Sequence, residues 1–234
     1  MLNEMKLFCT PVVCMLWNQS DLIEELRSQN IEVTMMPQLT WSHEYAMLRH
    51  QINYGYKKLI LKTRSTEIDA GYRKKFLSLR KRLRRIKDDT KNYLAFKWNP
   101  RLFEQLKKKE KIIVEQEQCF QEYKEWLQQL NVDGIFSVSP FLPEVELAAR
   151  ILKSENKLLL AAIHSFDNIT KRPWPAIHFH AYSVWNNYNK NELQRIFPGF
   201  PPDKIHINGA PQFDFHFNEK FLLPQTEWKK MLGI

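Results

Sequence analysis

The sequence has little glycine, with six residues among 234 at positions 55, 71, 134, 199, 209 and 233. They are too dispersed to form G-x-G-x-x-G or G-x-x-x-x-G-K-[ST], so the two common glycine-rich phosphate-binding motifs are excluded. Cysteine is also scarce, with three residues and no C-x-x-C pair, which indicates neither a disulfide framework nor a zinc knuckle. We therefore expect a reducing, cytoplasmic location.

Long hydrophobic runs are missing as well. No apolar run approaches the about 20 residues that a membrane-spanning helix needs. Residues 7–20 are uncharged, but Pro11 interrupts them and no small-residue cleavage site follows, so no signal peptide is expected. With 44% hydrophobic residues the chain has enough apolar surface for a packed core. The protein is expected to be free in the cytoplasm or peripheral at the inner face of the membrane.

Acidic residues are scarce in one segment of the chain. Residues 64–111 contain 17 Lys and Arg against 6 Asp and Glu, a local net charge of +11, although the whole chain carries only +9. Apolar residues recur every three or four positions from 68 to 86, which predicts an amphipathic helix over residues 66–86. The other face of this helix is predicted to be basic and is our candidate for membrane binding. Its residues are Arg73, Lys74, Arg80, Lys81, Arg84 and Arg85.

Three interpretations of this basic helix remain open. Basic residues on one face, with Phe76 and Leu79 on the other, suit adsorption to an anionic membrane. Binding to nucleic acid would use the same charges, but neither an RNA-binding pattern of interleaved aromatic and basic residues nor a helix-turn-helix pattern accompanies them. The third interpretation is a solvated face on a helix that packs against the core.

The remainder of the sequence predicts an α/β fold. A second long helix is predicted over residues 101–130, ending at Asn131. Short apolar runs then alternate with helical patterns, which is typical of a parallel sheet with crossover helices. Strands are predicted at 134–139, 158–164, 181–185 and 204–208, with helices at 143–154 and 189–197. Near the amino terminus, a helix before a strand at 31–36 predicts half of a β-α-β unit, whose first strand is expected to be poorly formed because Pro11 interrupts it.

Polar residues follow each of the four predicted strands. They occur at 137–139, 164–168, 185–187 and 208–214. In a parallel sheet, ligands bind beyond the carboxyl ends of the strands, so we expect these side chains to converge on one edge. Any one of these residues could simply cap a helix or close a turn. The prediction of a site therefore depends on polar residues following all four strands.

The same stretches carry a resemblance to a known family. The residues are HSFDNIT at 164–170, VWN at 184–186, a proline-rich turn at 198–202 and GAPQFD at 209–214. In this order they resemble the amino-terminal, acceptor-side domain of bacterial GT-B-type glycosyltransferases that make surface carbohydrates. Neighbouring families are the CDP-glycerol glycerophosphotransferases and the UDP-N-acetylglucosamine 2-epimerases. The resemblance covers residues 131–216.

The resemblance implies a domain organisation. It implies a three-layer Rossmann-like domain with a parallel sheet over residues 1–220, into which a long helical insertion at 64–131 adds two long basic helices. Residues 221–234 would begin the linker to a C-terminal nucleotide-sugar domain that lies outside this sequence. Because that domain supplies most donor contacts in the family, the isolated chain is expected to be inactive.

The resemblance also implies an activity. A sugar would pass from a nucleotide sugar to a hydroxyl of a surface polysaccharide or a lipid-linked glycan, with the nucleotide sugar as co-substrate and no resident cofactor. One alternative is a fragment of an enzyme similar to a nucleotide-sugar 2-epimerase or a glycerophosphotransferase. The other alternative is a non-catalytic basic module that binds a membrane or nucleic acid.

Asp167 is the predicted catalytic base, because transfer to a hydroxyl needs a proton acceptor where acceptor and donor meet. His164 is an alternative base, and a loop-shaping role for Asp167 remains open. The residues predicted to bind substrate are Ser139, His164, Ser165, Asn168, Trp185, Asn186, Gly209, Gln212 and Asp214. His178 and His180 share one face of an extended segment, but no third ligand stands at the spacing of a metal site, so no metal is expected.

Overall fold

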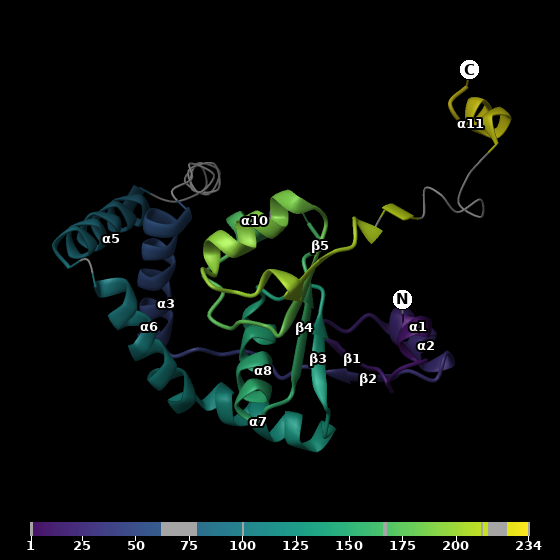
Figure 1. The fold of residues 1–234 in the computed structure, drawn as a ribbon, viewed down its shortest axis with the longest axis horizontal. Coiled ribbons are helices and arrows are strands. Elements are labelled where there is room, and N and C mark those ends of the chain that lie inside the picture. Colours follow the sequence, from purple (N-terminus) through teal and green to yellow (C-terminus); the bar gives the residue numbers. More distant parts are fainter. Residues whose placement is uncertain are drawn as a thin grey trace.

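The computed structural model describes residues 2–61, 79–99, 101–165, 168–211, 213–214 and 224–233. They form a mixed α/β fold with two parallel sheets, one of four strands and one of two (Figure 1). The four-stranded sheet stands in the middle of Figure 1, with most of the helices to its left and the two-stranded sheet to its right.

The four-stranded sheet confirms the predicted alternation of strands and helices. Its strands lie side by side in sequence order, and all neighbouring pairs are parallel. The strands are β3 (Gly134–Ser137), β4 (Leu158–Ala162), β5 (Ala181–Val184) and β6 (Ile205–Ile207). The connecting helices are α8 (Pro143–Ser154), the short α9 (Asn168–Lys171) and α10 (Asn187–Ile196). We call β3–β6 together with α8–α10 the α/β body.

The core of the α/β body lies on one face of the sheet. Consecutive parallel strands joined by right-handed crossovers place their connecting helices on the same side. On that side Leu159 and Ala161 are 0% and 2% exposed. Leu158 and Phe136, which point to the other side, are 53% and 38% exposed. Within the described residues, the opposite face of the sheet is therefore partly open to solvent.

The two-stranded sheet corrects one prediction. β1 (Val12–Met15) and β2 (Glu32–Met35) are parallel and are joined by α2 (Ser20–Ser28), which completes a β-α-β unit after the short α1 (Leu2–Met5). The expectation of a poorly formed first strand is wrong. Pro11 stands directly before β1 and not inside it, so no ladder donor is lost.

Several helices that lie between β2 and β3 in the sequence form a second unit, which we call the helical arm. It consists of α3 (His43–Gly55), the π-helix η1 (Tyr56–Leu61), α5 (Leu79–Trp98) and α6 (Leu102–Ile113). The predicted helix over 66–86 corresponds to α5 from residue 79 onward, and its earlier part lies outside the described residues.

The single long helix predicted over residues 101–130 is wrong. After α6 the chain forms a 3-10 turn, η2 (Val114–Gln116), becomes extended at Glu117 and then enters α7 (Gln118–Leu130). Both carboxylate oxygens of Glu117 accept hydrogen bonds from Ser42, one from its backbone N (2.8 Å) and one from its Oγ (2.6 Å). This contact across 75 residues fixes the break, so that α6 packs on α3 and α7 packs on α8. The predicted stop at Asn131 is confirmed by its left-handed φ of 47°.

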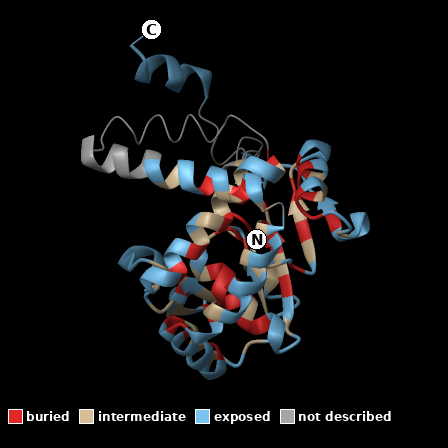
Figure 2. Cartoon of the chain, turned by 90° about the vertical axis from the view of Figure 1, so that its left-hand side faces the viewer, coloured by how far each residue is buried: buried red, intermediate tan, exposed pale blue. Residues whose placement is uncertain are grey.

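Aromatic side chains join the arm to the α/β body in one continuous core. Trp174, which follows α9, makes edge contacts with Tyr56 of η1 at 5.1 Å and with Phe103 of α6 at 5.4 Å between ring centroids. Figure 2 shows the buried residues gathered in the interior, with exposed residues along the outer sides of the helices. The arm is therefore packed onto the α/β body and does not stand away from it.

Four charged side chains form a largely buried ionic cluster between the same two units. Their side chains are only 5% to 16% exposed. Glu110 of α6 accepts from Arg150 of α8 at 2.9 Å and from Arg49 of α3 at 3.4 Å. Arg49 also bonds Glu146 of α8 at 3.0 Å, and the Tyr45 hydroxyl donates to Glu110 at 2.8 Å. Burial acts to lower the pKa of Arg49, but the carboxylates of Glu146 and Glu110 outweigh it and hold the pKa above its ordinary value.

The last described elements are a 3-10 turn, η3 (Pro202–Lys204), and the carboxyl-terminal α11 (Gln225–Met231). All described residues of α11 are exposed. Across the described parts of the chain, no helix is both long enough and apolar enough to span a membrane.

Candidate ligand site at the strand ends

The carboxyl ends of β3–β6 lie at one edge of the sheet, because all four strands run in the same direction. Ser139 follows β3, His164 follows β4, Asn186 follows β5 and Gly209 follows β6. This edge is at the top of the sheet in Figure 1. The structure therefore places the described candidates at one edge of one sheet, and their roles in binding stay predictions.

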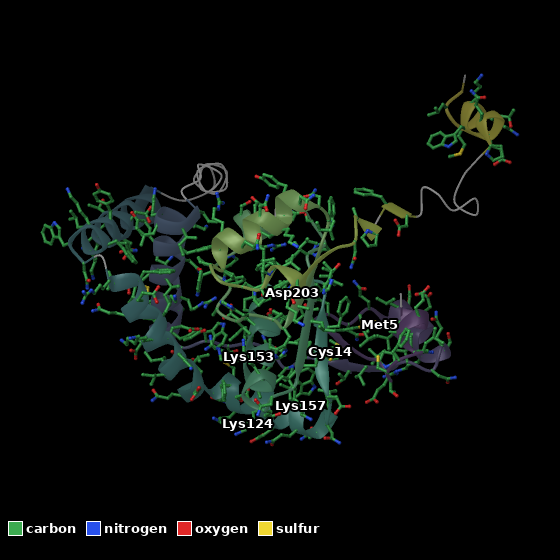
Figure 3. All side chains as sticks on the ribbon, viewed as in Figure 1. Met5, Cys14, Lys124, Lys153, Lys157 and Asp203 are labelled. Carbon is green, nitrogen blue, oxygen red and sulfur yellow. The ribbon has the colours of Figure 1, made fainter. Side chains whose placement is uncertain are left out.

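The opposite edge carries lysines that have protein partners. Lys124, Lys153 and Lys157 are labelled around the lower part of the α/β body in Figure 3. Lys153 Nζ donates to the carbonyl oxygen of His178 at 2.7 Å, and Lys157 lies 3.9 Å from Asp133. Two of the three lysines therefore have contacts that explain their position structurally.

A small hollow opens where β3 and β4 end. Its lining residues are Ser139, Phe141, Leu142, His164 and Arg172, and its volume is about 10 Å³. Sites that enclose a whole small molecule usually measure about 300–1,000 Å³. This strand-end hollow therefore has room for about one water molecule and not for a nucleotide sugar.

The loop after β3 is held by one hydrogen bond of its own and contacts the His164 side chain. The backbone N of Ser139 donates to Ser137 Oγ at 3.0 Å. His164 Nδ1 lies within hydrogen-bonding distance of the carbonyl oxygen of Val138. Because a carbonyl oxygen only accepts, Nδ1 carries the proton, and Nε2 is the ring nitrogen that holds the lone pair in the neutral imidazole.

Arg172 is the residue that sequence reasoning missed. It stands just after α9, in the same β4–β5 connection whose first residues were predicted to bind substrate. Its side chain is exposed, and it forms no ion pair within the described part of the chain. None of the five residues that line the hollow is acidic. No motif or periodicity of the sequence distinguishes Arg172 from the other basic residues of the chain.

The candidates after β5 and β6 have structural contacts of their own. Asn186 Oδ1 accepts from the backbone N of Asn189 at 3.0 Å and thereby caps α10. The Trp185 ring meets the Phe213 ring edge-on, with centroids 5.7 Å apart. Gly209 has a φ of 75°, a conformation that glycine adopts without strain, and it turns the chain after β6. The described contacts do not bring these residues into the strand-end hollow.

Several predicted residues are described only in part. Asp167 and Gln212 lie outside the described residues, and Asn168 is described only as the first residue of α9. Ser165 lies beyond β4 and is partly buried, and Asp214 is exposed beyond β6. The backbones of Arg80, Lys81, Arg84 and Arg85 belong to α5, whereas Arg73 and Lys74 lie outside the described residues. Membrane binding by this set stays a prediction.

The two histidines considered as metal ligands are engaged elsewhere. His180 Nδ1 accepts from the backbone N of Leu159 at 2.9 Å. The His178 ring lies against the Phe197 ring, with centroids 4.0 Å apart. Among the residues that the structure describes, no three His, Cys, Asp or Glu side chains are grouped so as to hold a metal ion.

No protein-family model, curated protein or solved structure matches the chain. The resemblance to GT-B glycosyltransferases therefore depends on the quoted motifs, together with an α/β fold whose parallel sheets are compatible with a Rossmann-like layout.

Proposed function

We propose that the chain is the acceptor-side part of a glycosyltransferase and that it binds a hydroxyl-bearing acceptor at the carboxyl edge of β3–β6. The observation that supports this most is the shared edge, where four parallel strands end beside polar residues. The strand-end hollow at that edge supplies a concave surface. The order of the motifs along the chain is the second support.

The proposed chemistry needs one proton acceptor. The acceptor hydroxyl oxygen attacks the anomeric carbon of the donor sugar, and the bond from that carbon to the nucleotide phosphate breaks. The electron pair of that bond leaves with the phosphate, and the hydroxyl proton passes to a base. Asp167, which follows β4 in the sequence, is the proposed base. His164 is the alternative, because its Nδ1 contact with Val138 leaves Nε2 as the basic nitrogen.

The donor contacts belong to a second domain in this proposal. The strand-end hollow is too small for a nucleotide sugar, which agrees with a separate donor site. We therefore expect residues 1–234 alone to release no nucleotide from any nucleotide sugar above background. Steady turnover by the isolated chain, followed as nucleoside diphosphate release, would contradict the division of the site between two domains.

The base assignment is tested in a longer protein that carries the donor domain. Asp167→Asn is expected to lower turnover by roughly 10²-fold or more while the circular dichroism spectrum stays unchanged. Asp203→Asn is the matched control, because Asp203 is an exposed aspartate on η3 (Figure 3). Near-normal turnover of Asp167→Asn together with a large loss in His164→Gln would transfer the role of base to His164. Near-normal turnover of both variants would show that the catalytic site does not lie at the carboxyl edge of β3–β6.

A further inference from the structure

We infer that the outer side of α5 binds the surface of an anionic lipid bilayer and inserts Leu94 and Trp98 among the lipid headgroups. We call this side, with Lys87, Lys91, Leu94, Lys97 and Trp98, the outer face of α5. It belongs to the arm and not to the carboxyl edge of β3–β6, so its role does not depend on the proposed function. Beyond the basic charge of the segment, it adds a pair of exposed apolar side chains that enter the membrane.

The packing of α5 determines which side of the helix is free. The helix contacts α3 and α6, and its Asn92 and Phe96 are buried. The Phe96 ring stacks on the ring of Tyr54 of α3, with centroids 6.0 Å apart. Figure 1 shows α5 at the outer end of the arm. The side of α5 opposite Asn92 and Phe96 is therefore turned toward solvent.

Two large apolar side chains stand on that opposite side. A helix has about 3.6 residues per turn, so Leu94, two positions from both Asn92 and Phe96, points away from the packed side. Trp98 follows Leu94 by four positions and shares its face. Trp98 is 79% exposed and Leu94 is 39% exposed. Large apolar side chains grouped on one exposed face indicate a surface that binds a partner.

Basic residues surround these apolar side chains. The three lysines of the outer face are exposed. Residues 79–101 contain 9 Lys and Arg against 2 Asp and Glu, a net charge of +7. The two acids, Asp88 and Asp89, precede Asn92 by one helical turn and are partly buried, so they lie toward the packed side. Anionic headgroups attract such a segment, and lysine stems can lie along apolar surface while the ammonium groups stay among the headgroups.

A lipid bilayer fits this combination better than a nucleic acid does. An indole ring suits the headgroup region, because its body is apolar and its N–H is polar. Leu94 gains from burial at the boundary of the acyl chains, whereas a phosphate backbone offers an aliphatic side chain nothing. Proteins that bind single strands line a charged groove with stacking rings, but the outer side of a single helix is convex.

The test is flotation of residues 1–234 with phosphatidylcholine vesicles that contain or lack phosphatidylglycerol. We expect binding to the anionic vesicles only. The double variant Leu94→Ser with Trp98→Ser should weaken this binding about tenfold or more, because two apolar side chains no longer enter the lipid. Lys87→Gln with Lys91→Gln should weaken binding at low salt and change it little at high salt, where charges are screened.

Trp17→Ser with Leu22→Ser is the matched control. Trp17 is 71% exposed and Leu22 is 39% exposed, values close to those of the pair on α5. Leu22 belongs to α2, which carries three acidic residues and one basic residue, so we expect this variant to bind like the unaltered chain. Equal losses in the two double variants would overturn the inference, as would unchanged binding in Leu94→Ser with Trp98→Ser. All four positions are exposed, so the circular dichroism spectra should stay unchanged.

A second measurement separates insertion from adsorption by charge alone. Lipids with brominated acyl chains quench the fluorescence of a tryptophan that enters the bilayer. We expect quenching in the unaltered chain and its loss in Trp98→Phe, which keeps an apolar ring and therefore keeps the binding. Binding without quenching, or quenching that persists in Trp98→Phe, would overturn insertion by this residue. Tighter binding to single-stranded RNA than to the anionic vesicles would overturn the assignment to lipid.

Discussion

The α/β body and the helical arm share one hydrophobic core but are held together in different ways. In the α/β body, neighbouring strands share parallel ladders, and side chains such as Leu159 and Ile163 are buried almost completely. The described elements of the arm are all helices. They join the body through aromatic contacts and through the ionic cluster of Arg49, Glu110, Glu146 and Arg150. The comparison indicates that the fold of the body depends mainly on local sequence pattern and on apolar burial. The position of the arm against the body depends on a few polar contacts between residues that are distant in sequence.

The largest effect is expected from breaking the ionic cluster. Glu110→Ala removes the carboxylate that accepts from Tyr45, Arg49 and Arg150. Loss of one partner in a buried ion pair costs about 3–5 kcal/mol, because the other charge remains buried. We expect a fall of that size in the free energy of unfolding, measured by urea denaturation.

Glu104→Ala is the control for this variant. Glu104 lies on the same helix, but its side chain is 64% exposed and pairs with Lys107 at the surface. Surface pairs contribute at most about 1 kcal/mol, so a small change is expected. Equal losses for the two variants would show that the cluster does not distinguish the arm from the body.

The second prediction concerns the two faces of β4. Leu159→Ala removes a side chain that is 0% exposed and is expected to cost about 2–5 kcal/mol through lost burial and a cavity. Leu158→Ala, one residue earlier and 53% exposed, should cost less than about 1 kcal/mol. Thermal and urea unfolding measure both variants. A cost for Leu158→Ala near that of Leu159→Ala would show that the partly open face is covered in solution.

The third prediction compares one glycine in each unit. An added Cβ at Gly134 would lie 2.4 Å from the backbone oxygen of Leu158, which belongs to the neighbouring strand and is hard to displace. At Gly55 it would meet Phe96 Cζ at 2.6 Å and Phe103 Cδ2 at 2.8 Å, the outer atoms of two rings that can rotate away. We expect Gly134→Ala to cost about 2–3 kcal/mol.

Gly55→Ala is expected to cost less, because alanine is favoured over glycine inside a helix by about 1 kcal/mol and offsets part of the strain. Both variants are measured by urea denaturation under the same conditions. The reverse order of the two losses would mean that the aromatic packing of the arm is more rigid than the strand pairing of the body.

The smallest effect per residue concerns charge. The basic residues of α5 are expected to drive salt-sensitive adsorption to anionic vesicles, each contributing on the order of 1 kcal/mol before screening. Cosedimentation with phosphatidylserine vesicles should decrease when Arg80 and Arg84 are reversed to Glu. The same double reversal away from α5, at Lys124 of α7 and at Lys157 before β4, is the control. Equal decreases would show that net charge matters and that α5 does not, and no decrease in either variant would reject membrane adsorption by this helix.

The α/β body could be predicted from its sequence because its signals are local. The predicted helix over 143–154 coincides with α8, where proline occupies the first helical position, and the four apolar runs became β3–β6. In the arm, α3 also has a local signal in the sequence. Ser42 is its N-cap, and Tyr45, Leu48 and Ile52 follow at helical spacing and are buried.

Other features had no local signal. The break between α6 and α7 depends on the contact of Glu117 with Ser42, 75 residues away, and no window of the sequence contains both residues. Arg49 and Glu146 are 97 residues apart. For the candidate site, strand order placed Ser139 and His164 at one edge, whereas the inclusion of Arg172 in the hollow depends on the path of the loop after α9. The periodicity of apolar residues therefore predicts the helices and strands. Contacts between residues distant in sequence determine where a helix breaks and which element it packs against.

The ionic cluster between arm and body also constrains how this sequence can evolve. Its two arginines and two glutamates balance to zero, so one substitution leaves an uncompensated charge in a place that water reaches poorly. Replacement of a whole pair by apolar residues of similar volume is tolerated far better. We therefore expect related sequences to change Arg49 together with Glu146, and Arg150 together with Glu110, with few surviving intermediates. These four positions would then be inherited as two linked pairs.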